Sequence, residues 1–305
     1  MAEHRLPAER LHFKWDVDHE SVLTISSGDT VTLSTAEITD GQVTPESTAV
    51  DIPAIDFERV YPLSGPLRVE GARVGQTLAV EIVDIETTEW GWAGILPGVG
   101  LLPDDFPDPY LRHFDLTTGD TTQFREDIAL PIEPFLGTIG VCPAGAHRQD
   151  VMPPGTFGGN IDTRQIGRGT TLYLPVQVDG AMFSCGDGHA AQGDGEVCVT
   201  AIECRVEARL RFTLVDRTIP APQYATSGTR VDSRGFYATT GVGPDLYRGA
   251  QDAVRAMIDH LGAEYGLSRE DAYVLSSLCV DLKISEVVDA GQYVVSAFLP
   301  LSVFR

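Results

Sequence analysis

The stretch Gly65–Glu86 reads GPLRVEGARVGQTLAVEIVDIE and predicts two β-strands around a glycine-rich turn. After the turn, Leu78, Val80 and Ile82 alternate with smaller or polar residues, which is the period of a strand with one buried face. From Val83 onward the apolar positions change parity. We therefore expect a β-bulge there, or burial of the strand on both faces.

Two other segments begin as this second strand does, with a glycine turn, a threonine and an apolar run. The three are SGDTVTL (27–33), VGQTLAV (74–80) and RGTTLYL (168–174). Such repeated openings suggest the hairpin units of a β-sandwich or barrel. A further strand is expected at Gly137–Val141 and more from Thr170 to Val206, while residues 87–159 are rich in Gly, Pro and Asp and are expected to be dominated by loops.

Helices are expected only near the C-terminus. Apolar residues recur with helical spacing from Pro244 to Gly266, where the glycine would stop the helix. A second helix is expected from Ser268 through Cys279, and the segment 292–304 (QYVVSAFLPLSVF) reads as a strand. The predicted fold is α+β and mainly β: a β-rich, sandwich- or barrel-like catalytic body over residues 1–206 and a C-terminal strand–helix–helix–strand unit over residues 207–305.

Charge and cysteine usage limit the class of protein. The 305 residues include 22 Lys and Arg against 44 Asp and Glu, a net charge of −22, which excludes a binder of nucleic-acid phosphates. Five scattered cysteines without a CxxC pair indicate free thiols in a reducing compartment. The first residues lack the apolar run of a signal peptide, and no apolar stretch is long enough to span a membrane. We therefore expect a cytoplasmic protein with no membrane partner.

The densest group of reactive residue types lies in CGDGHAAQGDGEV (185–197). Asp187 and His189 are two residues apart, as are Asp194 and Glu196, so in an extended chain each pair points to one face. A turn at Gln192 and the following glycine would bring the pairs together. Carboxylates around a single imidazole suit a divalent ion such as zinc, manganese or calcium. The alternative is a polar surface hairpin with Gly-Asp turns.

Two smaller patterns lie upstream. In GGNID (158–162), Asn160 and Asp162 share a face if the chain is extended. The same sequence is also typical of an Asx turn. His113 and Asp115 form an HxD pair, which is also typical of a surface strand with a tethered histidine.

Several other catalytic patterns are missing. The sequence has no GxSxG nucleophile elbow, no phosphate-binding loop and no dinucleotide fingerprint in a strand-to-helix setting. Cys185 and Cys198 flank the densest cluster, so a metal-free amidase with one of them as nucleophile and His189 as base stays open. A β-sandwich that binds a metal or ligand without catalysis also stays open.

The sequence resembles the acetamidase/formamidase family. The resemblance is carried by GDGHAAQGDGEVCVTAIE (186–203), GGNIDTR (158–164), GTTLYLPVQVDGA (169–181), PFLGTIGVCPA (134–144), SGDTVTL, the stretch 62–86 and SREDAYVLSSLCVDLKISEVVD (268–289). These segments cover nearly the whole chain in order. One departure is Phe157, where relatives often have a histidine or another polar residue before the Gly-Gly-Asn-x-Asp stretch, and His113 is a candidate for the missing imidazole.

The resemblance implies an enzyme that hydrolyses short aliphatic amides to carboxylate and ammonia, with a bound divalent ion, and that forms a homodimer or higher homo-oligomer. The expected metal ligands are Asp162, Asp187, His189 and Glu196, with zinc favoured over calcium or manganese. Glu196 would also act as general base. Asp194 would orient His189, and His113 completes the expected catalytic set. Asn160, with the backbone N–H groups of Gly158 and Gly188, would bind the substrate.

Overall fold

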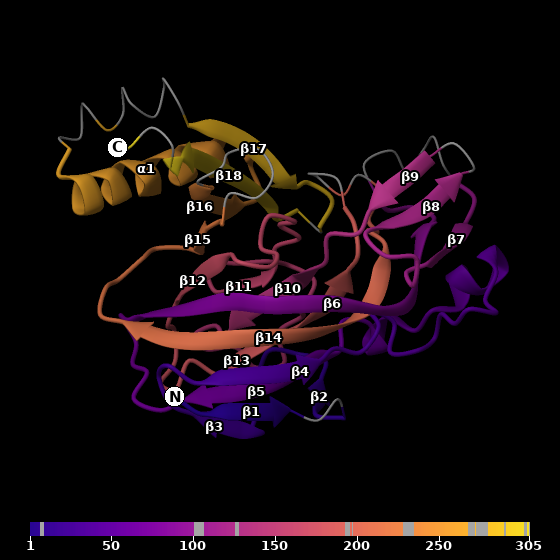
Figure 1. Ribbon diagram of the computed structural model, residues 1–305, viewed down its shortest axis with the longest axis horizontal. Helices are drawn as coiled ribbons and strands as arrows, with labels where there is room; N and C mark the ends of the chain where they lie inside the picture. Colours follow the sequence, from indigo (N-terminus) through magenta and orange to yellow (C-terminus); the bar gives the residue numbers. More distant parts are fainter. Residues whose placement is uncertain are drawn as a thin grey trace.

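The computed structural model describes residues 1–6, 9–100, 107–125, 128–192, 196, 198–227, 235–267, 272, 280–289, 291–301 and 304. Strands predominate, and one α-helix lies in this part of the chain (Figure 1). The fold is therefore α+β and mainly β, as the sequence predicts.

Nearly all of the described elements are strands. The first ten strands are β1 (Glu3–Leu6), β2 (Leu11–His12), β3 (Leu23–Ile25), β4 (Thr30–Ser34), β5 (Leu63–Val69), β6 (Thr77–Ile95), β7 (Tyr110–Asp115), β8 (Thr121–Arg125), β9 (Ile128–Pro131) and β10 (Phe135–Val141). The others are β11 (Gly158–Asn160), β12 (Thr171–Pro175), β13 (Phe183–His189), β14 (Glu203–Val215), β15 (Gln223–Ala225), β16 (Phe236–Gly243), β17 (Asp281–Glu286) and β18 (Tyr293–Pro300). Two short 3-10 helices, η1 (Ala49–Ala54) and η2 (Phe57–Arg59), precede β5, and α1 (Leu246–Tyr265) lies between β16 and β17.

One extended sheet joins sixteen of the described strands, and β8 and β9 pair separately. Its main path runs β11-β10-β13-β14-β6-β12-β15-β16-β18-β17. The long strands β6 and β14 cross the middle of the molecule, with the N-terminal strands on one side of them and the C-terminal strands on the other (Figure 1). The main hydrophobic core packs around these central strands and includes Val80, Ile82, Leu210 and Phe212, all fully buried.

The change of parity in β6 is a β-bulge. Ile82 lies opposite Leu210 and Asp84 lies opposite Arg209, so Val83 has no partner of its own on β14. Leu78, Val80 and Ile82 are buried before the bulge, and Ile85 is buried after it. The extra residue thus returns the apolar side chains to the core face, and the first of the two expected explanations is confirmed.

The three segments with glycine–threonine openings are all strands, and they lie close together in the sheet. They form β4, the start of β6, and β12. Glu81 of β6 is paired with Thr171 of β12 on one side and Arg211 of β14 on the other, and Arg211 is also paired with Thr30 of β4. The starts of β4 and β12 are therefore level with Glu81, whereas the start of β6, at Thr77, lies opposite Pro175 at the end of β12.

The C-terminal unit contains one helix of the predicted pair. Helix α1 begins after Asp245, whose side chain accepts a hydrogen bond from the N–H of Arg248 at 2.9 Å, and it ends at Gly266 in the left-handed conformation, with φ of 67°. Its apolar face packs on β16 and β18. The second predicted helix falls almost entirely outside the described residues. Strand β17 was not predicted and is paired with β18.

Two features of the middle of the chain differ from expectation. The segment 87–159 is not dominated by loops, because it holds the end of β6, all of β7–β10 and the start of β11. The expected boundary between residues 206 and 207 falls inside β14, a central strand.

The four described cysteines are free. Of the helices that are described, none is both long enough and apolar enough to cross a lipid bilayer.

Candidate active site

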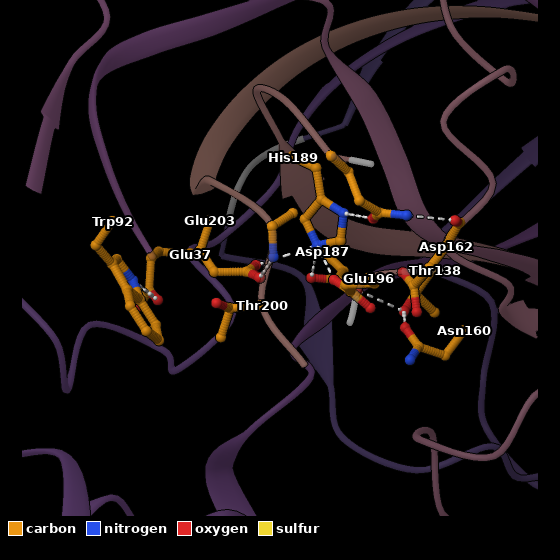
Figure 2. A network of polar contacts seen from close by, with 12 residues as sticks. Glu37, Trp92, Thr138, Asn160, Asp162, Asp187, His189, Glu196, Thr200 and Glu203 are labelled. Carbon is orange, nitrogen blue, oxygen red and sulfur yellow. Dashed lines mark hydrogen bonds and ion pairs between the residues drawn. The ribbon is translucent and has the colours of Figure 1, made fainter. Parts of the chain in front are cut away.

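Four antiparallel strands bring the predicted ligands together. Strand β10 pairs with β11 and β13, and β13 pairs in turn with β14. This places Asp187 and His189 on β13 beside Asp162, which follows β11, and beside Glu203, which lies opposite His189 on β14 (Figure 2). Asp162, His189 and Glu196 offer ligand atoms that all lie within 4.8 Å of one another, and so do Asp187, His189 and Glu203.

His189 Nε2 is the centre of the cluster. It lies 3.0 Å from Oδ1 of Asp187, 3.1 Å from Oε2 of Glu203 and 3.9 Å from Oε1 of Glu196. All four side chains are almost completely buried. Asp162, Asp187, His189 and Glu196 thus line one cavity, whereas a metal ion and their role as its ligands stay predictions.

Two hydrogen bonds of the Gln192 side chain determine which nitrogen of His189 faces the carboxylates. The backbone oxygen of Asp162 accepts a hydrogen bond of 2.7 Å from Nε2 of Gln192, so the amide oxygen of Gln192 points to Nδ1 of His189, at 3.0 Å. Nδ1 therefore carries a hydrogen and donates it. This leaves Nε2 toward the carboxylates, which is the arrangement that orients an imidazole as a ligand.

The three acidic residues around His189 have strained backbones. Asp162, Asp187 and Glu196 adopt φ of 39°, 58° and 45°, in the left-handed region that non-glycine residues seldom occupy. The expected extended geometry is therefore broken at Asp187, although its side chain still meets His189. Such strain costs about 1–3 kcal/mol per residue and clusters at functional sites.

Gly137 of β10 leaves room among these ligand atoms. A Cβ at this position would lie 2.4 Å from Oδ1 of Asp162, 2.6 Å from Oδ2 of Asp187 and 2.8 Å from Cε1 of His189. Any side chain here would occupy the space into which the two carboxylates point. Both side-chain oxygens of Asp162 are buried and have no hydrogen-bond partner within the described part of the chain.

A second polar chain links the cluster to the C-terminal unit. Nδ2 of Asn160 donates to Oδ2 of Asp289 over 2.5 Å, and Oδ1 of Asn160 accepts from the hydroxyl of Thr138 over 2.6 Å. The same hydroxyl lies 3.3 Å from Oδ2 of Asp187. Asp289 is itself held by its backbone N–H, which donates to Oε1 of Glu286 at 2.7 Å.

Burial and mutual repulsion determine the charge state of the cluster. Burial raises the pKa of Asp162 well above its ordinary value, and the negative charges of Asp187 and Asp289 raise it further. Burial also raises the pKa of Glu196, and it raises that of Glu203 to about 7 although His189 opposes the shift. For His189, burial lowers the pKa, but the charges of Glu203 and Asp187 outweigh this effect and hold it well above the usual value.

The cluster therefore needs positive charge. Five buried acids line one cavity against a single imidazole, and no Lys or Arg is among the described residues that line it. Buried charges persist only when they are paired, neutralised or bound to a cation. A divalent ion meets this need, and the unpartnered oxygens of Asp162, the oxygen donors and the open space beside Gly137 all fit one.

The cavity has a volume of about 330 Å³. Its polar lining contains Asn160, Asp162, Asp187, His189, Glu196, Glu203 and Asp289. Its apolar lining includes Trp92, whose Nε1 donates to Oε1 of the buried Glu37 at 2.9 Å. Phe157, the departure noted in the sequence, packs in the main core against Trp15.

Asp194, His113, Gly158 and Gly188 complete the predicted site set. Asp194 falls outside the described residues, and the orienting contact expected of it is made by Gln192. His113 lies exposed on β7, with Nε2 2.8 Å from the backbone oxygen of Ser47, so the structure does not bring it into the cluster. Gly158 and Gly188 are required for packing: a Cβ would meet the backbone oxygen of Ile139 at 2.5 Å or that of Cys204 at 2.7 Å.

The geometry disfavours a cysteine nucleophile. Cys185 is completely buried in the main core, and burial raises the pKa of its thiol strongly, which suppresses the reactive thiolate. Cys198 is exposed and lies beside Thr200, in a different hollow from the one that holds His189.

Three residues of the site were not singled out from the sequence. Glu203 stands at the end of the quoted motif, and the pairing of β13 with β14 would have placed it opposite His189. Gln192 lies at the predicted turn. Asp289 is 100 residues beyond His189, and nothing in the local sequence signals that it reaches the same cavity.

Comparisons with known proteins identify the family of the chain. The family model described as "Acetamidase/Formamidase family" matches residues 2–151 and 144–305. The formamidase of Methylophilus methylotrophus is 25% identical, with 97% of this chain and 90% of that protein covered.

Two solved structures share the whole fold. The acetamidase from Bacillus halodurans is 34% identical, with a TM-score of 0.90 and 98% of both chains covered. A protein from Thermoanaerobacter tengcongensis, described as a predicted acetamidase/formamidase, is 30% identical with the same TM-score, over 99% of this chain and 97% of that one. The chain thus belongs to the acetamidase/formamidase family and is an amidohydrolase that acts on linear amide C–N bonds.

Proposed function

We propose that the chain hydrolyses short aliphatic amides to a carboxylate and ammonia, with a divalent metal ion held by Asp162, Asp187, His189 and Glu196. The observation that carries the proposal is the buried group of carboxylates around His189 Nε2, in which both oxygens of Asp162 lack a hydrogen-bond partner among the described residues. Zinc suits a mixed set of imidazole and carboxylate ligands best, while calcium and manganese favour oxygen.

A divalent ion, when bound, supplies Lewis acidity, which polarises a carbonyl and lowers the pKa of water toward ~7 in the case of zinc. The protein supplies the orientation and the proton transfer. Gln192 holds His189 with Nε2 toward the carboxylates, and the link to Asp289 and Thr138 fixes Asn160 at the cavity wall.

Glu196 is suited to move the proton. Its buried carboxyl lies 3.9 Å from Nε2 of His189, where it can take a proton from the attacking water and give it to the leaving nitrogen. The C–O bond to water forms, the C–N bond breaks, and the nitrogen leaves as ammonia. Glu203, whose pKa is about 7, lies on the opposite side of His189 Nε2 and is the second group that can hold a proton there.

The test combines metal analysis with ammonia release. Purified protein is analysed for bound metals, stripped with a chelator, and assayed on formamide and acetamide before and after zinc, manganese or calcium is restored. We expect stripping to remove nearly all turnover and one ion to restore it. Full activity in protein shown to be free of metal would overturn the proposed role of the ion, and no ammonia from any amide would overturn the proposed function.

Two further proposals follow from the family. We propose that the protein forms a homodimer or higher homo-oligomer and acts in the cytoplasm. Sedimentation of the purified protein measures the first, and fractionation of cells that express the natural gene measures the second.

A further inference from the structure

The cavity of the candidate active site is larger than its simplest substrate needs. Its volume of about 330 Å³ falls in the range of roughly 300–1,000 Å³ that is typical of sites for drug-sized ligands. Formamide has only three non-hydrogen atoms. Most of the space therefore lies beyond what the amide group itself and an ion would occupy.

Much of the remaining lining is apolar, and five of its side chains form one wall of the cavity. Ile38, Ile55 and Trp92 belong to a hydrophobic cluster of their own, separate from the main core, and Val60 and Leu96 pack against it. All five line the cavity. The wall is built by the chain after β4, by the segment around η1 and η2, and by β6 and the residue after it, whereas the carboxylates come from β13, β14 and the loop after β11.

The apolar lining continues outward to the surface. Phe57 of η2 lines the same cavity and has 59% of its area exposed. Val99 also lines the cavity and is 44% exposed. A group that starts at the carboxylates therefore meets apolar side chains of the lining, and Phe57 and Val99 stand at the exposed end of the same cavity.

We propose that this site prefers primary amides whose acyl group is an apolar chain of about four to six carbons over formamide and acetamide. The inference rests on the proposed function, since it concerns the substrate of the same site. The amide group lies at the carboxylate cluster, and the acyl chain lies along the wall formed by Ile38, Ile55, Val60 and Leu96, with Phe57 at its outer end. The reaction is unchanged: water replaces ammonia on the acyl carbon.

The expected gain follows from the hydrophobic effect. Burial of one methylene group raises a binding constant by a factor of about four. If the chain lies along the wall in the transition state, kcat/KM rises by this factor for each added methylene until the wall ends. A site shaped for formamide alone would show the opposite trend, because longer chains would clash or stay in water.

The experiment measures kcat/KM for formamide, acetamide, butanamide and hexanamide by ammonia release, with protein of measured metal content. We expect a rise of at least tenfold from acetamide to butanamide. A rate that stays flat or falls along the series overturns the inference while the proposed function stands. No ammonia from any of the four amides overturns the proposed function and the inference with it.

Two variants test the wall itself. Phe57→Ala removes an exposed ring and does not threaten the core, and it should lower kcat/KM for hexanamide at least five times more than for acetamide. Leu96→Phe places a larger side chain in the cavity, and it should also lower kcat/KM mainly for the longer amides. Tyr247→Ala, which removes a ring that is 75% exposed on α1, is the matched control and should leave the whole series unchanged. Equal effects of Phe57→Ala on all amides would contradict the proposed position of the acyl chain.

Discussion

Asn160 and Asp289, which are 129 residues apart in the sequence, meet through a hydrogen bond of 2.5 Å from Nδ2 to Oδ2. The contact joins the strand that precedes Asp162 to the loop after β17, so the C-terminal unit forms part of the cavity. It also orients the amide of Asn160, whose oxygen then accepts from Thr138. The C-terminal unit is therefore needed for the geometry of the site.

Asp289→Ala should lower kcat/KM at least tenfold, because a buried N–H of Asn160 that loses its acceptor costs about 1–3 kcal/mol and the amide becomes free to turn. Asp289→Asn keeps an acceptor oxygen and should restore a large part of the loss. Amide kinetics with separate kcat and KM measure this, and Asp252→Ala on the exposed face of α1 is the control. Equal losses in the two Asp289 variants would contradict a positioning role.

Gly137→Ala should abolish most activity and weaken ion binding by at least tenfold. The added methyl group would meet oxygens of Asp162 and Asp187 at 2.4 and 2.6 Å and fill the space between them. Metal titration of stripped protein followed by calorimetry measures the affinity. Gly243→Ala serves as control, because a Cβ there meets nothing within 4 Å. A Gly137→Ala protein that binds the ion as well as the wild type would show that the space is not an ion site.

Asp162→Asn should make metal-free protein more stable while it weakens stabilisation by the ion. Removal of a buried negative charge relieves repulsion from Asp187 and Asp289, so we expect Tm of the stripped protein to rise. Added ion then raises Tm less than in the wild type, since stabilisation by a ligand follows its affinity. Thermal unfolding with and without ion measures both effects, with Asp108→Asn on the surface as control. A lower Tm in the stripped variant would mean that Asp162 is not a source of repulsion.

Cys198→Ala and Cys185→Ala should both retain the turnover of the wild type. Cys185 is packed in the core, so its replacement is expected to lower Tm without changing kcat, and the thiol of the exposed Cys198 lies beside Thr200. Ammonia release from acetamide measures the turnover. A loss of more than a hundredfold in either variant, in protein that remains folded, would favour a thiol nucleophile instead.

The strands of the body could be predicted because each carries its own local signal. Alternating apolar residues and a glycine–threonine start predict β4, β6 and β12, and the change of parity at Val83 predicts the bulge. Strand pairs such as β7 with the end of β6 carry no such signal, since their residues are mixed and their partners are set by packing. The loop-rich interpretation of residues 87–159 was wrong for this reason.

The site shows the same limit. Two short motifs with conspicuous residue types pointed to the candidate ligands. The segment 158–162 contains Asp162, and the segment 185–197 contains Asp187, His189 and Glu196. Their meeting depends on β10, which pairs with both motifs and whose Gly137 leaves space for them. Asp289 could not be found, because it reaches the cavity through the arrangement of the C-terminal strands.

The buried histidine of β2 gives a test of the fold by pH that does not involve the candidate site. Nδ1 of His12 donates to the backbone oxygen of Lys14 at 2.8 Å, so Nε2 accepts from the hydroxyl of Ser184, also at 2.8 Å. Burial lowers the pKa of His12 to about 4. The neutral ring therefore contributes stability that is complete above its unfolded pKa of about 6.5 and is lost as the pH falls toward 4.

For the wild type, this histidine alone should reduce the free energy of unfolding by about 2 kcal/mol between pH 7.5 and pH 5. His12→Gln should be less stable at pH 7.5, because it loses the fit to Lys14 and Ser184, but its stability should fall less over this interval. Urea unfolding at both pH values measures the difference, with the exposed His147→Gln as control. The other buried histidines, His189 and His260, are present in every variant, so their contributions cancel in the comparison. Equal pH dependence in His12→Gln and the wild type would mean that the imidazole of His12 is not held neutral in the folded protein.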